Sequence, residues 1–141
     1  MESKSTNNLQ NELMATSNLS RFLSENQESF DNEDFAEKLQ SIFQSKNISK
    51  AALAKNSGMS EVYLYQIFSG GRNPSRNRII CLCIGLYATL EEAQELLKGS
   101  GNAQLYVKDR RDAIIIYGLL HNMTLEEVNE RLFSEKEKTL C

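Results

Sequence analysis

The chain reads SKAALAKNSGMSEVYLYQIFSGGRNPS from Ser49 to Ser75, and this stretch is the most informative about its fold. It is typical of two short helices joined by a tight turn and followed by a basic loop. Gly58 can adopt the positive φ that ends a helix sharply, and Ser60 can cap the helix that follows it. Leu64 and Ile67 lie three residues apart, so we expect both to face the first helix.

This segment resembles the helix-turn-helix of Cro/C1-type (XRE-family) bacterial and phage regulators, over roughly residues 33–97. The residues that carry the resemblance are Leu53, Ala54, Gly58, Ser60, Leu64, Ile67, Ser69 and Gly70. It implies an all-α, five-helix domain of the lambda-repressor type, in which residues 60–68 form the recognition helix that enters the DNA major groove.

We predict that the chain has three parts. Residues 1–30 form a flexible or amphipathic N-terminal arm, with apolar residues at roughly helical spacing from Leu9 to Phe30. Residues 31–99 form the helix-turn-helix domain. Residues 100–141 form a C-terminal helical pair that packs on the same domain.

Two similar capping patterns mark helix starts in the second half of the chain. Thr89 is followed by Glu92, and Thr124 by Glu127, which is the spacing of a capping box. Each pattern follows an apolar helix, so we expect stacked helical hairpins and not a true repeat architecture, which needs about three repeats. The β-branched run in 114–117 leaves a strand as the local alternative, although its context favours a helix over about 108–121.

The charge of the chain is unevenly distributed. The net charge is −3, which alone argues against a nucleic-acid partner. Residues 46–78, however, carry six basic residues against the single acid Glu61, whereas residues 1–45 and 79–141 are both net acidic. A local basic patch on an acidic chain is typical of phosphate binding, and the alternative is a solvated basic face.

The predicted recognition helix supplies the candidate base-reading residues, which are Glu61, Val62, Tyr65 and Gln66. The amide of Gln66 suits a bidentate contact with adenine, and Val62 suits a thymine methyl group. Glu61 can accept a hydrogen bond from cytosine, although it also repels phosphate. This is not the Gln- and Arg-rich surface of a strong operator binder.

A second group is predicted to contact phosphate, and it comprises Lys50, Ser60, Tyr63, Arg72, Asn73 and Arg76. Lys50 lies near a helix start, where the family places a phosphate contact. Arg72, Asn73 and Arg76 lie in or after the loop that faces the DNA backbone in the family. The alternative for Asn73 is a turn, and the alternative for Tyr63 and Tyr65 is packing within the protein.

Several other classes of function are not expected. The single histidine and the three cysteines suggest neither a catalytic constellation nor a metal site, so we expect no enzyme, no cofactor and no small-molecule ligand. The sequence contains no long apolar run and no signal peptide, so we expect a cytoplasmic protein without a membrane span.

Two classes of function therefore remain. The first is a DNA-binding transcriptional regulator that acts as a homodimer, because a two-fold protein matches a two-fold site; the dimer surface would lie on the C-terminal helices or the arm. The second is a helix-turn-helix scaffold for protein–protein interaction, because the apolar and tyrosine-rich face of Val62, Tyr63 and Tyr65, with Glu61, also suits a protein partner.

Overall fold

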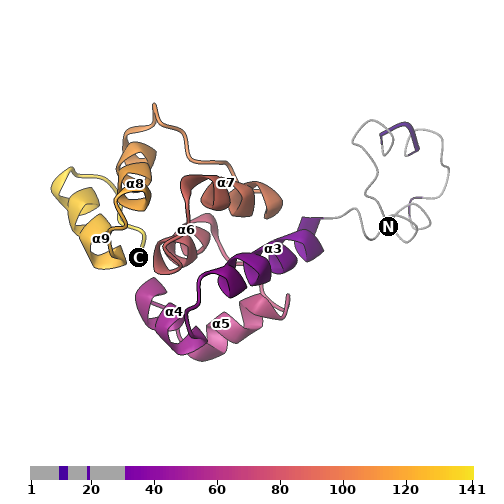
Figure 1. The fold of residues 1–141 in the computed structure, drawn as a ribbon. Coiled ribbons are helices and arrows are strands. Elements are labelled where there is room, and N and C mark those ends of the chain that lie inside the picture. Colours follow the sequence, from indigo (N-terminus) through magenta and orange to yellow (C-terminus); the bar gives the residue numbers. More distant parts are fainter. Residues whose placement is uncertain (1–9, 13–18, 20–30) are drawn as a thin grey trace.

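The computed structural model describes residues 10–12, 19 and 31–141 of the chain (Figure 1). From residue 31 onward the helices are α3 (Asp31–Ser45), α4 (Lys50–Ser57), α5 (Glu61–Phe68), α6 (Arg76–Gly85), α7 (Leu90–Gly99), α8 (Arg110–Leu120) and α9 (Leu125–Ser134). The described residues contain no strand, so the predicted all-α class is confirmed, and the run in 114–117 is helical. The predicted arm, residues 1–30, lies outside the described residues except at 10–12 and 19.

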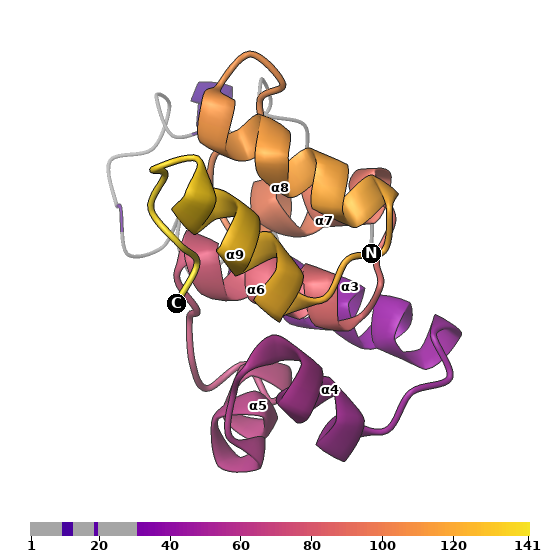
Figure 2. The same ribbon diagram turned by 90° about the vertical axis from the view of Figure 1, so that its left-hand side faces the viewer.

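Helix α6 lies at the centre of the fold and packs against α4, α7, α8 and α9. Its residues from Ile79 to Gly85 are all buried, including Cys81 and Cys83. A helix that is apolar on every side is stable only when other helices surround it. Figure 2 shows α6 between the α4–α5 pair below and the α7–α8 pair above.

The helix-turn-helix forms for the local reasons that its sequence predicts. The Ser49 hydroxyl accepts a hydrogen bond from the Ala52 amide at 3.1 Å, and the Ser60 hydroxyl accepts one from the Tyr63 amide at 3.1 Å. Each such cap contributes about 1 kcal/mol to helix stability. Gly58 has a φ of 69° and ends α4. The turn at Gly58 and the cap of α5 at Ser60 therefore match the prediction.

A second glycine fixes the distance between α4 and α6. A Cβ atom added at Gly85 would lie 3.1 Å from the Cβ atom of Ser57. The backbone of α6 at Gly85 therefore lies directly against Ser57 of α4, with no room for a side chain between them. The buried Ser57 hydroxyl is satisfied, because it donates to the Leu53 carbonyl at 2.7 Å.

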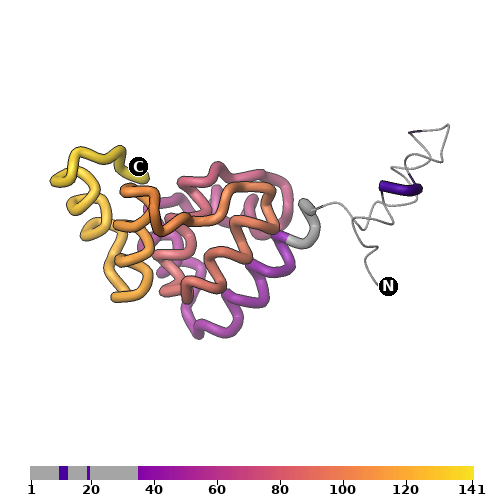
Figure 3. Tube along the Cα trace, turned by 90° about the horizontal axis from the view of Figure 1, so that it is seen from above, coloured from indigo at the N-terminus to yellow at the C-terminus, as the bar shows by residue number. Residues whose placement is uncertain are grey.

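Helix α3 covers the other side of the core and lies alongside α7 (Figure 3). Its buried residues Phe35, Leu39 and Ile42 face the core. Lys46, just beyond the end of α3, forms an ion pair of 2.7 Å with Glu92 of α7.

Both predicted capping boxes are present. The Thr89 amide donates to Glu92 at 2.8 Å and the Glu92 amide donates back to Thr89 at 3.1 Å. The equivalent bonds between Thr124 and Glu127 are 3.0 Å and 3.2 Å long. Helices α6 and α7 pack together, as do α8 and α9, so two helical hairpins follow each other in the chain.

The residues after α9 turn back onto the fold. Leu140 is buried, and its amide donates to the Asn129 side chain at 2.8 Å. Arg111 of α8 donates to the Lys138 carbonyl at 2.7 Å. In the part of the chain that the structure describes, no helix combines the length and the apolar character required to cross a membrane.

Candidate nucleic-acid interface

One side of α5 is left uncovered by the other residues that the structure describes. Leu64 and Ile67 are fully buried against the core, whereas Val62 is 68% exposed and Tyr65 is 54% exposed. The helical repeat of 3.6 residues separates these two sides. All four predicted base-reading residues, Glu61, Val62, Tyr65 and Gln66, therefore lie together along one exposed surface, which we call the α5 outer face.

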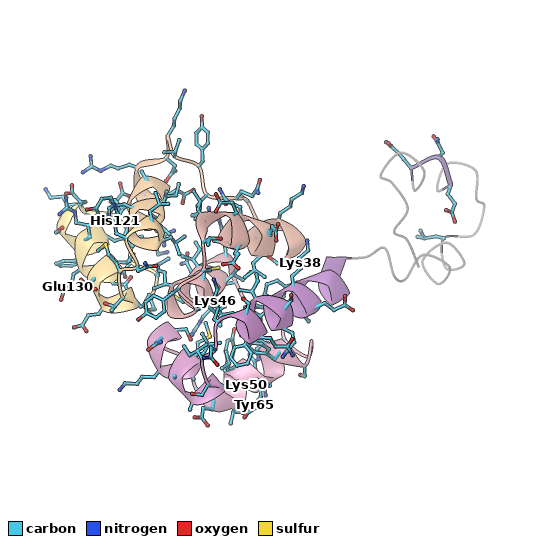
Figure 4. The ribbon with its side chains drawn as sticks, in the orientation of Figure 1. Lys38, Lys46, Lys50, Tyr65, His121 and Glu130 are labelled. Atoms are coloured by element: carbon cyan, nitrogen blue, oxygen red, sulfur yellow. The ribbon has the colours of Figure 1, made fainter. Side chains whose placement is uncertain are left out.

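Lys50 lies along one edge of this face. Its Nζ atom is 4.8 Å from the ring centroid of Tyr65 and 5.0 Å from that of Phe68. An ammonium at this distance from aromatic rings is held in place by the cation–π attraction. Figure 4 shows Lys50 and Tyr65 next to each other at the lower edge of the molecule. A positive charge is thus positioned beside the exposed Tyr65 side chain.

Two arginines lie along the opposite edge. The guanidinium carbon of Arg72 is 4.8 Å from the ring centroid of Tyr63, and that of Arg78 is 5.3 Å from the same centroid. Arg72 also donates from Nε to the side-chain oxygen of Gln66 at 2.9 Å. Tyr63 thus contacts two exposed cations, and the bond from Arg72 restricts the orientation of the Gln66 amide.

Arg78 was missed by the sequence reasoning about the site. It is one of the six basic residues in 46–78, but its position in the sequence, near the start of α6, does not indicate which side of the helix its side chain occupies. The signal that could have found it is the packing of α6 against the helix-turn-helix, which brings Arg78 to Tyr63.

Arg76 lies away from this group of cations. Its guanidinium group donates to both carboxylate oxygens of Asp112, at 3.0 Å and 3.4 Å. It also donates to the carbonyl oxygens of Ala103 at 2.9 Å and Gln104 at 3.3 Å. All three nitrogen atoms of its guanidinium group are therefore engaged within the protein.

The remaining predicted phosphate contacts are Ser60 and Asn73. Ser60 is exposed and uses its hydroxyl oxygen as the cap of α5. Asn73 is exposed, and within the described residues its side chain makes no hydrogen bond. It lies directly before the buried Pro74.

Comparison with known proteins agrees with this geometry. The family described as helix-turn-helix matches residues 39–83, from within α3 to within α6. Neither the search of curated proteins nor the search of solved structures found a match. The matched range includes both helices of the motif, the Gly58 turn and the basic loop. The match over residues 39–83 confirms the predicted resemblance of this segment to the helix-turn-helix of Cro/C1-type (XRE-family) proteins.

Proposed function

We propose that this protein is a DNA-binding transcriptional regulator that inserts α5 into the major groove. The observation that supports this most is the arrangement of cations around the α5 outer face, with Lys50 along one edge and Arg72 and Arg78 along the other. A helix in the major groove lies between two phosphate backbones, so cations on both sides of it are well placed to contact them.

The phosphate contacts are assigned to Lys50, Arg72 and Arg78, with Ser60, Tyr63 and Asn73 as neutral donors beside them. The aromatic contacts of Lys50 and Arg72 restrict their side chains before DNA arrives, which lowers the entropy lost on binding. The first amides of α4 add donors at a helix start. We leave Arg76 out of this set, because its donors already bind Asp112 and two carbonyl oxygens.

Base reading is assigned to the α5 outer face. Gln66 is the candidate for adenine, and the amide group of Gln66 is oriented by Arg72. Val62 is the candidate for a thymine methyl group, and Glu61 for the amino group of cytosine.

The protein acts as a homodimer in this proposal, because one α5 helix reads only a short half-site.

A second candidate function is a protein-interaction module that uses the same helix. The exposed apolar side chains of Val62 and Tyr65 favour it, since aromatic residues are enriched at protein interfaces. The two functions differ in how they respond to salt. Contacts with phosphate release counterions and weaken steeply as salt rises, whereas an apolar interface responds little.

The test is fluorescence anisotropy of the full chain with a pool of double-stranded DNA, at about 50 and about 200 mM salt. We expect binding at the lower salt, a steep loss at the higher salt, and at least about a tenfold weaker affinity for the variant Arg72→Glu/Arg78→Glu. The matched control is Lys108→Glu/Lys136→Glu, which changes the net charge equally at exposed positions away from α5.

The control should bind like the wild type. Absence of binding at low salt, or an equal loss in both double variants, would overturn the DNA proposal. Binding of a host protein that is insensitive to salt and lost on Tyr65→Ala would then support the protein-interaction module.

A further inference from the structure

A groove on the C-terminal hairpin has no function in the proposal above. It encloses about 590 Å³ between α8 and α9, and it is lined mainly by apolar surface from Ile114, Tyr117 and Met123. Beside it on α8, Leu120 is 61% exposed, and Tyr117 itself is 56% exposed. Exposed apolar residues that gather around a groove mark a site of interaction with another molecule.

The aromatic side of the groove is ordered by local contacts. The rings of Tyr117 and His121 lie 4.1 Å apart, centroid to centroid, at an interplanar angle of 33°. These residues are one helical turn apart, so their stacking fixes both side chains at the rim of the groove. The hydroxyl group of Tyr117 makes no hydrogen bond among the described residues.

The charges around the groove carry both signs. Glu127 and Arg131 line it, and Glu130 lies beside them in the adjoining surface hollow. Arg131 pairs with Glu135 at only 3.6 Å, and Glu130 has no ionic partner within the described part of the chain. A two-fold axis next to this turn of α9 would bring Arg131 of each copy opposite an acid of the other. The opposite charges of Arg131 and Glu130 thus suit a contact between two copies of this surface.

The position of the groove also suits a two-fold protein on DNA. In Figure 4, Lys50 and Tyr65 lie at the lower edge of the molecule, whereas His121 and Glu130 lie at the left-hand edge. A two-fold axis that runs from top to bottom beside α9 would leave both α5 helices on the same, lower side. Two half-sites on one DNA duplex require this arrangement.

From these observations we infer that the surface formed by this groove and the adjacent Leu120 binds the same surface of a second copy of this chain, with Tyr117 and Leu120 in the contact and Arg131–Glu130 pairs across the axis. The inference deepens the proposed function, since it rests on a dimeric DNA-binding protein and names the surface through which the two copies associate.

The test is the mass of the full chain in solution, measured by sedimentation without DNA. We expect twice the 16.0 kDa chain mass for the wild type and the single-chain mass for Leu120→Glu. Val107→Glu is the matched control, because Val107 lies in the loop before α8, outside the groove, and is 67% exposed. It should remain a dimer.

A charge exchange provides a second, independent test of the interface. Arg131→Glu should weaken the dimer at least about tenfold, and Arg131→Glu/Glu130→Arg should restore much of the loss. A monomeric wild type, a dimeric Leu120→Glu variant, or equal dissociation by Val107→Glu would overturn the inference. Because the mass is measured without DNA, the two proposals can be told apart. A dimer that binds no DNA would contradict DNA binding alone, whereas a monomer that binds DNA would contradict the homodimer and this inference but not DNA binding by α5.

Discussion

Arg76, the first residue of α6, holds Asp112 near the start of α8 through two hydrogen bonds, the shorter of which is 3.0 Å long. Asp112 is buried, and it also accepts a hydrogen bond from the Tyr106 amide at 3.0 Å. A buried carboxylate is tolerated only when such donors surround it. The pair thus joins the helix-turn-helix to the C-terminal helices and fixes the loop between α7 and α8.

Replacement of Arg76 should therefore affect stability more than DNA contacts. Arg76→Ala leaves the buried Asp112 carboxylate without its cation, and we expect the free energy of unfolding to fall by about 2 kcal/mol. Urea unfolding measures this change. The control Arg78→Ala removes an exposed arginine two residues later, and it should lower the free energy of unfolding by less than about 0.5 kcal/mol. Equal losses in the two variants would contradict the structural role of Arg76.

The contact between α8 and α9 depends on Gly118. A Cβ atom added there would lie 2.6 Å from Cγ2 of the buried Val128. Overpacking of this kind costs about 1–3 kcal/mol, against a gain of about 1 kcal/mol in helix propensity. We expect Gly118→Ala to lower the free energy of unfolding in the wild type and to be neutral or stabilising in a Val128→Ala background. Thermal unfolding of the wild type, the two single variants and the double variant tests this. Changes in the free energy of unfolding that simply add in the double variant would contradict it.

Glu92 should make stability depend on pH in the acid range. Burial raises its pKa, but the Lys46 ammonium and the Thr89 amide outweigh burial, so that the pKa of Glu92 lies below the ordinary value of 4.5. The folded chain therefore binds this proton less tightly than the unfolded chain does. The resulting stability is present above about pH 4.5 and is lost as the pH falls through the lowered pKa.

The role of Glu92 is tested by measuring the free energy of unfolding of the wild type and of Glu92→Gln as a function of pH. The variant should be less stable than the wild type near neutral pH, and the difference should shrink as the pH falls below 4.5. Lys46→Ala should remove part of the same pH dependence. A difference between wild type and Glu92→Gln that stays constant with pH would show that the carboxylate has no such role.

The three cysteines should differ in reactivity. Burial raises the pKa of Cys81 and of Cys83 to about 12, whereas Cys141 is exposed. Because the thiolate is the reactive form, we expect one fast thiol in the folded chain and two that react only on unfolding. Titration with a thiol reagent counts them, with Cys141→Ser as the control that should lose the fast one. Fast reaction of all three would contradict the buried position of α6.

The features that could be predicted from the sequence are those determined within a few residues. Gly58, Ser60 and the boxes at Thr89 and Thr124 act on backbone groups within one turn, so their spacing alone indicates them. The predicted helix over 108–121 begins later, at Arg110, because Asp109 is its cap and accepts from the Asp112 amide at 2.9 Å.

The features that could not be predicted join residues far apart in the chain. Arg76, Arg78 and Arg72 look alike in the sequence, since each is a cation in or after one loop. Only the packing of α6 and α8 determines that Arg76 faces Asp112 while Arg78 faces Tyr63. Local periodicity contains no information on that choice.

The most direct test of the central claim, that α5 reads DNA, is selection of bound sequences from random double-stranded DNA by the wild type and by Gln66→Ala. We predict an enriched motif for the wild type, and for the variant the same motif with its preference for adenine lost at one position, a change of about 1–3 kcal/mol there. No enriched motif for the wild type, or an identical motif for Gln66→Ala, would contradict the assignment of base reading to the α5 outer face.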